Sequence, residues 1–585
     1  MSAAAAEPFL GVAASATGRL WQGLAPETQR RAEALAQAAA LPPSLAAVLA
    51  RLGVPPEDVK PFLSPKLRDL MPDPSQLHDM DRAAARLVQA VTGRERIAVF
   101  ADYDVDGACS AALLLNWLRD LGLAASLYIP DRQDEGYGPN VPAMQELAAA
   151  HDLILCVDCG TLAHEPIAAA RGADVLVLDH HLGGETLPPA LAVVNPNRQD
   201  ETGDLAHLCA AAVVFLLLVA ANRLLRAAGR REPDLMALLD LVALATVADV
   251  APLVGLNRAL VRQGLLVMAR RARPGLAALA DVARLDAAPS AHHLGFLLGP
   301  RINAGGRIGR ADLGARLLAT ADAAEARALA EKLDVLNAER RGIEEAVRAE
   351  ALAQAEARGL DGPLVWAAGE GWHPGVVGIV AARLKEAANR PAVVIGIGAG
   401  EGKGSGRSVA GVDLGGAVAR LASEGWLLKG GGHRMAAGLT VEAGRIEGAM
   451  ARLGELLARQ GAGAEAPRVL HLDGLLMPGA ASVELIERLE AAGPFGAGAP
   501  APRFAFPALK VAFAARAGES HLRLTLADDS GSRLEAIAFR AFEGPLGPLL
   551  ESHAGARFHF AGRLEVDSWG GRRRAKLRLE DAAPA

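Results

Sequence analysis

Acidic residues follow short apolar runs at three places in the chain, and a pair of histidines accompanies the third. The residues at these ends are Asp102, Asp104, Asp158, Asp179, His180 and His181, and a further acid, Asp249, follows the apolar stretch 235–247. In a parallel sheet the carboxyl ends of the strands meet at one edge, where open α/β sheets bind their ligands. The pattern therefore predicts one carboxylate-rich site.

Several carboxylates in one crevice repel one another unless cations neutralise them. Asp102, Asp104, Asp158 and Asp249 carry four negative charges, which two divalent cations balance. One imidazole among oxygen ligands suits Mn²⁺ or Mg²⁺ better than a thiolate-seeking metal. Two such ions about 3.5 to 4 Å apart activate a water and stabilise both oxygens of an in-line attack at phosphorus. The predicted chemistry is phosphoester hydrolysis.

Each aspartate also has a plainer explanation, because an aspartate after a strand is often only the N-cap of the next helix. Its recurrence at three strand ends, together with the doubled histidine, favours the metal site.

The elements that position these residues belong to a chain of 585 residues with 51% hydrophobic content, which is enough for roughly two to four domains. From Arg96, short apolar runs alternate with helical stretches, as in a parallel α/β domain. A second α/β pattern begins at Pro363, with glycine-rich turns expected at 396–406 and 430–432. After Ala466, short strand-like segments predict a small β-barrel.

The predicted fold class is α/β, with two such domains joined by long helices and a C-terminal barrel. In chain order we expect a helical N-terminal lead-in, a catalytic domain, connecting helices, a substrate-binding domain and a nucleic-acid-binding domain. Their predicted bounds are 1–82, 83–311, 312–359, 360–465 and 466–585.

Charge and hydropathy exclude some classes of protein. The net charge of −6 argues against coating nucleic acid through bulk electrostatics, so any such contact must be local. The longest apolar run, 208–221, is shorter than the roughly 20 residues of a membrane span, and predicts a buried helix and no membrane association. Without a visible secretory signal or a disulfide framework, the expected compartment is the cytoplasm.

Two weaker motifs are rejected. Cys156 and Cys159 form a C-x-x-C pair, but structural zinc usually needs four ligands, and the other two cysteines stand alone. The glycine-rich stretch 396–406 lacks the glycine spacing and the Ser or Thr of a P-loop, so ATP use is not expected.

Four segments resemble the successive motifs of the DHH phosphoesterases, and their flanks resemble the RecJ family of nucleases. These segments are Asp102-Tyr103-Asp104-Val105-Asp106-Gly107, Val157-Asp158-Cys159-Gly160, Asp179-His180-His181 and Thr246-Val247-Ala248-Asp249. The resemblance implies that the metal ligands are Asp102, Asp104, Asp158, His180 and Asp249, with Asp158 as a bridge. It also implies that His181 binds the scissile phosphate and that Asp106 and Asp179 support the loops; the catalytic set is then His181, Asp158 and Asp106.

Further segments resemble substrate-binding motifs of the same family. Residues 299–307 are expected to form a glycine-rich loop whose guanidiniums suit phosphate oxygens, although a loop arginine is often merely solvated. Residues 404–408 and 430–433 resemble the DHH-associated domain, DHHA1. The implied substrate contacts are Arg301, Asn303, Arg307, Ser405, Arg407 and His433. His373 is expected to begin a helix rather than to act in catalysis.

The C-terminal segment resembles the RecJ turn that leads into an OB-fold, at 493–496 and 502–504. Such barrels bind single strands by stacking bases on aromatic side chains along a basic groove. The expected contacts are Trp569, Arg572, Arg573 and Arg574, with Phe504, Phe539 and Arg540 as further candidates. For each phenylalanine, core packing is an equally good explanation.

The resemblance as a whole implies an exonuclease specific for single-stranded DNA, working from 5′ to 3′ with two Mn²⁺ or Mg²⁺ ions in DNA repair and recombination. DNA would thread between the two α/β domains. The expected partners are single-stranded DNA, a helicase and a single-strand-binding protein, and the expected state is a monomer. One alternative is a phosphodiesterase for short oligonucleotides or cyclic dinucleotides, whose members usually lack the long connector and barrel. Another is an inactive single-strand-binding scaffold, which should have lost its metal ligands.

Overall fold

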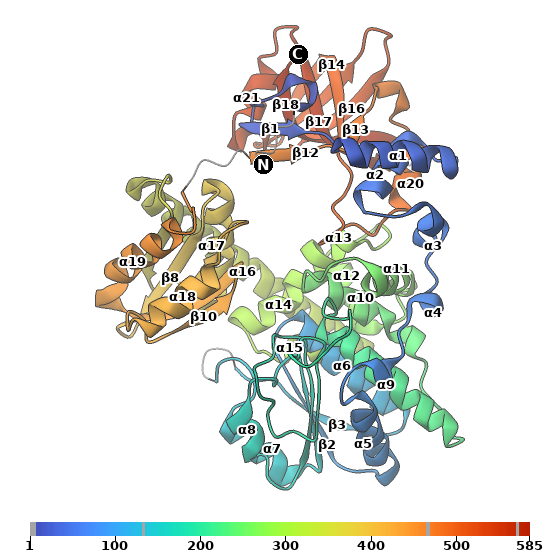
Figure 1. Ribbon diagram of the computed structural model, residues 1–585, viewed down its shortest axis with the longest axis vertical. Coiled ribbons are helices and arrows are strands. Elements are labelled where there is room, and N and C mark those ends of the chain that lie inside the picture. The colour runs from blue at the N-terminus through green and yellow to red at the C-terminus, as the bar shows by residue number, and fades with distance from the viewer. Residues whose placement is uncertain (1–6, 132–134, 464–467, 569–571) are drawn as a thin grey trace. The chain divides into compact units, whose positions relative to one another are not determined.

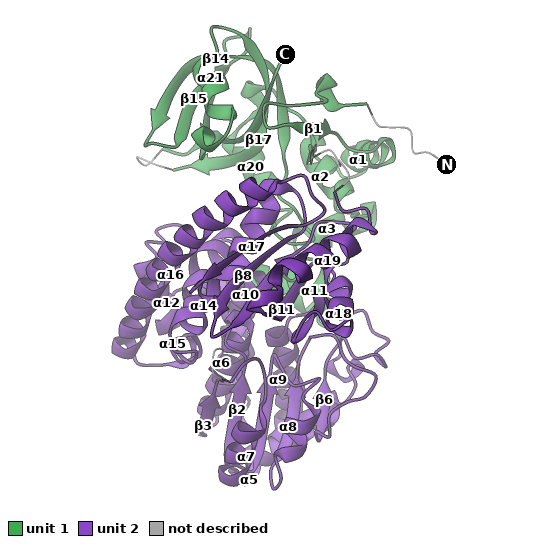
Figure 2. Cartoon of the chain, turned by 90° about the vertical axis from the view of Figure 1, so that its left-hand side faces the viewer, with its two compact units in different colours: residues 1–72, 250–263, 467–585 green, residues 73–249, 264–466 purple. Residues whose placement is uncertain are grey.

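The computed structural model describes residues 7–131, 135–463, 468–568 and 572–585. They divide into two compact units, which Figure 2 draws in different colours. Unit 1 combines 1–72, 250–263 and 467–585, and unit 2 combines 73–249 and 264–466.

Unit 2 begins with a sheet of five parallel strands. Their order is β3 (Ala125–Tyr128), β2 (Ile97–Ala101), β4 (Leu153–Val157), β5 (Asp174–Leu178) and β6 (Ala192–Val194). Strands β2 and β4 are buried along their whole length, because helices cover both faces of the sheet. Parallel strands that are buried on both faces read as continuous apolar runs, and this is how they appeared in the sequence.

The two helical layers of this sheet lie on opposite sides in Figure 1. One layer holds α7 (Val141–Ala150) and α8 (His164–Ala169), and the other holds α5 (Met80–Gly93), α6 (Val105–Asp120) and α9 (Ala210–Ala227). Helix α9 is long and apolar enough to cross a membrane by length and composition alone, but 72% of it is buried inside the structure. It is therefore a core helix of unit 2, as the sequence predicted.

A helical region connects the first sheet to the second. It contains α10 (Leu239–Ala248), α12 (Pro274–Val282), α13 (Ala291–His293), a π-helical turn (Leu294–Leu298), α14 (Gly299–Ile308), α15 (Leu313–Ala319) and α16 (Ala323–Arg358). Helix α11 (Gly255–Met268) lies between α10 and α12 in the chain, and most of it belongs to unit 1. The expectation of connecting helices after residue 312 is confirmed, with α16 alone spanning 36 residues.

The expected loop at 299–307 is wrong, because this stretch is helix α14. Its glycines permit close packing: a Cβ on Gly306 would lie 2.7 Å from the carbonyl oxygen of Tyr103, and one on Gly305 would lie 3.2 Å from Leu333. The glycines therefore mark a helix pressed against its neighbours rather than a flexible turn.

The second sheet of unit 2 is mixed. Its order is β10 (Lys429–His433), β11 (Ala436–Glu442), β9 (Glu401–Arg407), β8 (Ala392–Gly398) and β7 (Val365–Glu370), and only β7 and β8 are parallel. Helices α17 (Pro374–Ala388), α18 (Leu414–Ser423) and α19 (Ile446–Ala458) pack on it.

The glycine-rich turns expected in this region are also wrong, since most of 396–406 lies in strands β8 and β9 and 430–432 lies in β10. A Cβ on Gly404 would come within 2.9 Å of Leu439 and 3.0 Å of Ile395, and one on Gly406 within 2.7 Å of Leu414. Alternate residues of a strand share a face. The glycines therefore lie on the face of β9 against which large apolar side chains pack, and a larger residue would not fit there.

Unit 1 contains a closed barrel, as expected. Its strands run in the order β14 (Phe504–Ala517), β15 (His521–Ala527), β16 (Arg533–Ala538), β18 (Arg574–Pro584) and β17 (Arg557–Asp567), and β17 pairs again with β14. The short strand β13 (Gly474–Leu475) adds to β14, and α20 (Val483–Glu490) and α21 (Leu546–Glu551) complete this part.

The N-terminal segment packs into the same unit. Helices α1 (Pro26–Ala38) and α2 (Pro43–Arg51) share a hydrophobic core with the barrel, and the short helices α3 (Val59–Leu63) and α4 (Leu67–Leu70) follow. This segment is not wholly helical, because β1 (Arg19–Gln22) pairs in parallel with β12 (Arg468–His471). The buried indole of Trp21 donates to Asp581, 2.9 Å away.

Candidate metal centre

The predicted acids meet where the strand order of the first sheet reverses. From β2 the chain moves outward to β3, then returns past β2 to β4 and continues to β5 and β6. This makes the gap between the carboxyl ends of β2 and β4 the topological switch point, where open α/β sheets place ligands. Asp102 follows β2 and is 4% exposed, and Asp158 follows β4 and is 1% exposed.

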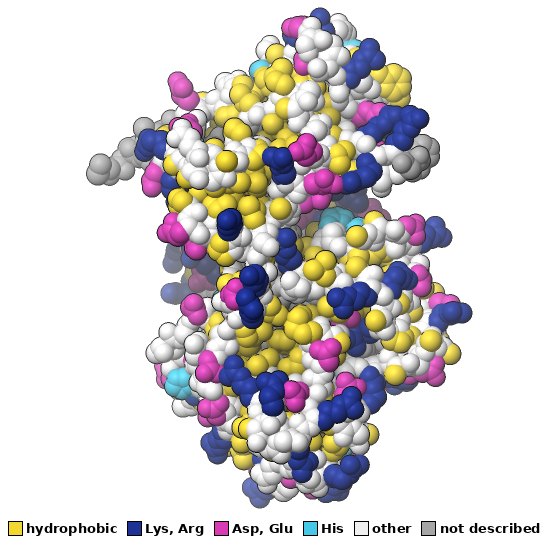
Figure 3. Space-filling model, turned by 90° about the vertical axis from the view of Figure 1, so that its right-hand side faces the viewer, with side chains coloured by type: hydrophobic (Ala, Val, Ile, Leu, Met, Phe, Trp, Pro, Cys, Tyr) yellow, Lys and Arg dark blue, Asp and Glu magenta, His cyan; other side chains and the backbone are white. Residues whose placement is uncertain are grey.

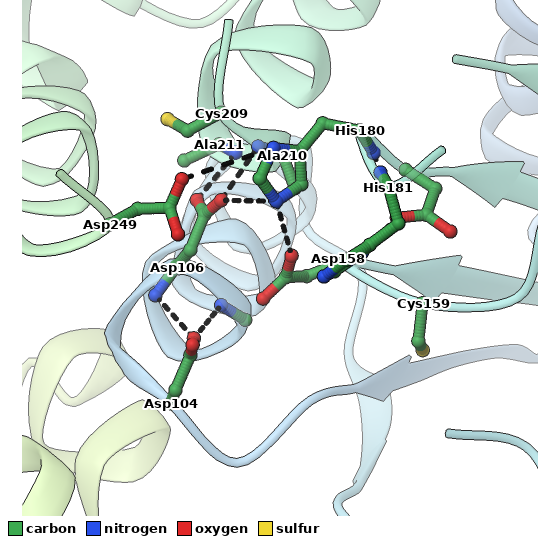
Figure 4. A network of polar contacts seen from close by, with 12 residues as sticks. Asp104, Asp106, Asp158, Cys159, His180, His181, Cys209, Ala210, Ala211 and Asp249 are labelled. Atoms are coloured by element: carbon green, nitrogen blue, oxygen red, sulfur yellow. Dashed lines mark hydrogen bonds and ion pairs between the residues drawn. The ribbon is translucent and has the colours of Figure 1, made fainter. Parts of the chain in front are cut away.

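The structure brings all five predicted metal ligands together. Figure 4 shows four of them, Asp104, Asp158, His180 and Asp249. Three groups have potential ligand atoms within 4.8 Å of one another: Asp102, Asp104 and Asp158; Asp106, His180 and Asp249; and Asp158, His180 and His181. Asp158 belongs to two of these groups. That position fits the bridging role implied for it, which stays a prediction.

His180 lies at the centre of the carboxylates. Its Nε2 is 3.2 Å from Asp158 Oδ1 and 3.7 Å from Asp106 Oδ2, and its Nδ1 is 3.9 Å from an oxygen of Asp249. One imidazole carries at most a single positive charge. The negative charge of three nearby carboxylates is therefore larger than the charge that this ring can neutralise.

The pKa values of the clustered carboxyls show which kind of ligand suits them. Burial raises the pKa of Asp249 to about 8, and the charges of Asp106 and Asp104 add to this effect. Burial and the neighbouring aspartates also raise the pKa of Asp158 well above its usual range, and burial raises the pKa of Asp106. Carboxyls in this state favour protons or bound cations over the free ionised form. The donor set is thus suited to divalent ions that prefer oxygen ligands.

Local backbone geometry fixes two of the ligand loops. Asp158 has a φ of +59°, a conformation that Asp and Asn adopt more readily than most residues. In the first loop, a Cβ on Gly107 would lie 2.4 Å from the carbonyl oxygen of Asp102, so only glycine fits there. Strained backbone of this kind persists where the surrounding structure holds it, often at functional sites.

Asp104 is at once a helix N-cap and a potential metal ligand, the two roles that the sequence allows for an aspartate after a strand. It is the N-cap of α6, accepting from the amides of Asp106 at 2.8 Å and Gly107 at 3.2 Å through one oxygen. It also belongs to the group with Asp102 and Asp158. An N-cap and a potential metal ligand are therefore the same residue here.

Asp106 links the first loop to α9. Its two oxygens accept from the amides of Ala210 at 2.7 Å and Ala211 at 2.8 Å, at the N-terminus of that helix. This position fits the supporting role implied for Asp106, and its catalytic role stays a prediction.

His181 is held by Asp179. Its Nδ1 lies 2.7 Å from Asp179 Oδ1, and the same oxygen accepts from the amides of His180 and His181. Burial disfavours a charged ring, but the hydrogen bond and charge of Asp179 prevail and raise the pKa of His181 to about 9. Despite its own burial, Asp179 has a lowered pKa because it accepts from His181 and Thr161. The imidazolium and carboxylate therefore stabilise each other.

Three residues that the sequence analysis missed complete the site. The hydroxyl of Tyr137 lies 3.1 Å from His181 Nδ1 and 3.1 Å from the carbonyl oxygen of Asp158. Asn195 donates to the carbonyl oxygen of His181 at 2.8 Å, and Asn197 donates to that of His180 at 2.6 Å. The asparagines directly follow β6, so the strand-end argument, extended from acids to amides, would have found them. Tyr137 lies in a loop and carried no such signal.

The four cysteines are free and buried, and the metal-capable groups found in the described residues contain none of them. Burial raises the pKa of Cys156 to about 12 and also raises the pKa of Cys159 well above its usual range. Both cysteines of the C-x-x-C pair belong to the buried hydrophobic cluster beside the first sheet.

The predicted residues of the second sheet share one face. Arg407 and His433 both pair with Ala436 across neighbouring strands, and Ser405 lies two residues before Arg407. Directly paired and alternate residues point to the same side of a sheet. Arg407 donates to Ser405 Oγ at 3.0 Å, and a Cβ on Gly378 of α17 would lie 3.0 Å from that oxygen. His373 begins α17 as its N-cap, as expected.

The predicted substrate residues of α14 make intramolecular contacts. Arg301 Nε donates to Asp334 of α16 at 2.8 Å, and Arg307 Nη1 donates to the carbonyl oxygen of Gly375 at 2.9 Å. Asn303 Oδ1 accepts from the amide of Val105 at 3.1 Å. A role for the three in substrate binding remains a prediction.

The predicted barrel contacts are only partly covered, since Trp569 lies outside the described residues. Arg573 pairs with Glu487 at 2.8 Å and Arg574 with Glu535 at 3.3 Å, while Arg572 is exposed. Phe504 is a core residue at 1% exposure, whereas Phe539 is 47% exposed. On the face drawn in Figure 3, leaving aside the grey atoms, basic and acidic side chains are interspersed without a continuous basic area. Any contact with nucleic acid on that face must be local.

Comparison with known proteins identifies three parts of the chain. Residues 96–246 match the DHH family N-terminal domain, 361–459 the DHHA1 domain and 472–581 the RecJ OB domain. The first range contains the first sheet with most of its acids, the second range contains the second sheet, and the third contains most of the barrel.

The chain is also similar to characterised proteins over most of its length. It is 39% identical to the single-stranded-DNA-specific exonuclease RecJ of Dickeya dadantii, over 93% of this chain and 97% of that protein. It is 36% identical to the RecJ of Escherichia coli, over 87% and 91%. A crystal structure of RecJ from Thermus thermophilus in complex with Mn²⁺ superposes with a TM-score of 0.80 at 32% identity, covering 97% of this chain and 79% of that one. With its DHH, DHHA1 and RecJ OB domains, this chain belongs to the RecJ family.

Proposed function

We propose that this chain is a metal-dependent exonuclease that removes nucleotides from the 5′ end of single-stranded DNA. The observation that carries the proposal is the convergence of Asp102, Asp104, Asp158, His180 and Asp249 at the switch point of the first sheet. The relatives from Dickeya and Escherichia are named as single-stranded-DNA-specific exonucleases, which supports the substrate class.

Two divalent cations, Mn²⁺ or Mg²⁺, fit the donor set, and solved RecJ structures from Thermus contain each of these metals. When bound, such a pair would supply an activated water and neutralise charge at the phosphorus. Asp102, Asp104, Asp158, His180 and Asp249 would hold the ions, and Asp158 would be shared between them.

The remaining steps belong to the protein's own side chains. The bond between Nδ1 and Asp179 raises the pKa of His181 to about 9, which favours an imidazolium whose Nε2 is a donor. We assign that donor to a non-bridging oxygen of the scissile phosphate, where a positive charge stabilises the transition state. Asp106 and Asp179 hold the loops on which these groups stand.

The direction of digestion depends on how the DNA end is held. Ser405, Arg407 and His433 offer a hydroxyl, a guanidinium and an imidazole on one face of the second sheet. This combination suits the phosphate at a 5′ end. The barrel would hold the strand further along by stacking and local charge.

We also infer a cytoplasmic monomer that works in DNA repair and recombination with a helicase and a single-strand-binding protein. The four free thiols agree with a reducing compartment. Light scattering checks the monomer, which a molar mass near twice 60.5 kDa would contradict.

The test of the proposed reaction is digestion of single-stranded DNA labelled at its 3′ end, with Mn²⁺ or with EDTA. Shortening from the 5′ end that requires Mn²⁺ is the expected result. Consumption of di- to pentanucleotides with long DNA left intact would favour a small-substrate phosphodiesterase. If neither substrate changed, the chain would be a binding scaffold.

A further inference from the structure

The first turn of α6 carries the metal-binding loop at its start, and its backbone amides are all accounted for. The opening N–H groups of a helix have no acceptor within the helix. Here Asp104 Oδ1 accepts from Asp106 and Gly107, and the carbonyl oxygen of Asp104 accepts from Ala108 at 2.9 Å. The amide of Val105 remains, and Asn303 accepts from it at 3.1 Å.

Asn303 reaches this amide from a helix 198 residues later in the chain. Helix α14 lies directly against the loop, because a Cβ on Gly306 would come within 2.7 Å of the carbonyl oxygen of Tyr103. Residues three apart lie on the same side of a helix. Asn303 and Gly306 thus form one contact face of α14 toward the loop that contains Asp102 and Asp104.

The arginines of α14 bind this helix to other parts of unit 2. Arg301 is bonded to Asp334 of α16 and to the carbonyl oxygen of Leu297, and its side chain is only 11% exposed. Arg307 reaches the carbonyl oxygen of Gly375 at the start of α17. A helix held at both ends is a firm support for the amide of Asn303.

We infer that Asn303 is a positioning residue of the metal centre, which fixes the Asp102–Asp104 loop through the amide of Val105 instead of contacting DNA. Val105 is buried, at 2% exposure. Without Asn303 the N–H of Val105 would lose its acceptor within the protein, and the turn would move to satisfy it. Asp104 is the residue before Val105, so such a movement displaces a ligand.

The consequence for catalysis rests on the proposed function, but the structural consequence does not. Removing a group that orients metal ligands typically weakens metal binding by about ten- to a hundredfold. For Asn303→Ala we expect Mn²⁺ affinity to fall by about tenfold, with a lower kcat at limiting Mn²⁺ and little change in the KM for DNA.

The variants are Asn303→Ala, Asn303→Asp and Asn337→Ala. Asn303→Asp replaces the amide oxygen by a carboxylate oxygen, which can also accept from Val105, and should restore most of the Mn²⁺ affinity. Asn337→Ala is the matched control, because it removes a buried helical asparagine whose side chain accepts from Arg340 in α16. If Asn303→Ala does not fold, Asn303→Ser is used instead. The serine side chain is shorter than that of asparagine, so its hydroxyl does not reach the amide of Val105.

Three readouts are measured for each variant: hydrogen exchange of peptides covering 102–108 in the metal-free protein, Mn²⁺ binding by electron paramagnetic resonance, and nuclease kinetics. Faster exchange and weaker Mn²⁺ binding in Asn303→Ala, but not in Asn303→Asp or the control, are expected. Unchanged exchange and Mn²⁺ binding, with or without a raised KM, would overturn the inference. The first two readouts need no nuclease activity, so a failure of the proposed function would appear separately, in the kinetics of the unaltered protein.

Discussion

Acidic side chains gather at the strand ends of the first sheet, whereas basic side chains stand on one face of the second sheet. At the first site, buried aspartates come from separate loops, and burial raises the pKa of Asp158 and Asp249. At the second site, Arg407 and His433 stand on β9 and β10, the two strands that flank β11, and His433 is exposed. Loops after parallel strands gather many ligands at one point, whereas a strand face offers a few groups at fixed spacing.

This difference separates the two tasks of a phosphodiester hydrolase. The first site has an excess of negative charge and is suited to cations, while the second has donors suited to an anionic end of the substrate. Variants at the first site should therefore change metal binding and kcat, and variants at the second should change KM.

The largest effect is expected for Asp158→Asn. Asparagine has the same shape and tolerates the positive φ of this position, but it lacks the charge that a shared metal ligand needs. We expect activity with saturating Mn²⁺ to fall by about a thousandfold or more. The thermal midpoint of the metal-free variant should be unchanged or raised, because a buried carboxyl with a raised pKa is removed.

Asp152→Asn is the control for that variant, since Asp152 forms a surface pair with Arg96 at 2.8 Å. Full activity of Asp158→Asn would contradict the assignment of the first site as the metal centre. If the control lost as much activity, the effect would come from a disturbed fold rather than from a lost metal ligand.

A smaller effect is expected for Arg407→Ala. Loss of a charge-assisted contact to the substrate should raise the KM for 5′-phosphorylated DNA by about ten- to a hundredfold. Mn²⁺ affinity should not change, because Arg407 lies in the second sheet. Steady-state kinetics and a Mn²⁺ titration check both statements, with Arg420→Ala as a surface control on α18. A fall in kcat at constant KM would place Arg407 in the chemical step and remove the contrast between the sites.

Replacing Arg572, Arg573 and Arg574 together by alanine should weaken binding of long single strands by about tenfold. Each lost phosphate contact also reduces the slope of log affinity against log salt by about 0.7. Digestion of a tetranucleotide should change less, because a strand with few phosphates has few to offer to a second binding surface. Fluorescence anisotropy at several salt concentrations measures the slope, and equal effects on both substrate lengths would argue against a separate barrel contact.

The smallest effect is expected for Tyr137→Phe. The hydroxyl that lies 3.1 Å from His181 is lost, but the bond between His181 and Asp179 remains. Removal of one such hydrogen bond should lower kcat by about fivefold. Single-turnover kinetics provide the measurement, and Tyr128→Phe, whose hydroxyl contacts Glu135, is the matched control. If Tyr137→Phe had no effect, Asp179 alone would suffice to orient His181.

The contrast also explains what the sequence predicted well. Asp102, Asp158 and Asp179 follow apolar strands, and the geometry of a parallel sheet requires neighbouring strand ends to meet. Their convergence follows from local pattern and topology alone. The closed barrel was predicted from the spacing of short strands for the same reason.

The glycine-rich segments were misread because their structure depends on distant partners. Gly404 faces Ile395 and Leu439, and Gly306 faces the backbone of Tyr103. Nothing near either glycine in the sequence shows that a neighbour fills the space of its missing side chain. Tyr137 was missed for a related reason, since its contact with His181 joins a loop to a strand end 44 residues later.

The central claim is that the acids of the first sheet form a centre for two cations, and Mn²⁺ titration followed by electron paramagnetic resonance tests it most directly. The account predicts two Mn²⁺ ions per chain in the unaltered protein and no more than one in Asp158→Asn. Absence of Mn²⁺ binding, or the same two ions bound in the variant, would contradict it.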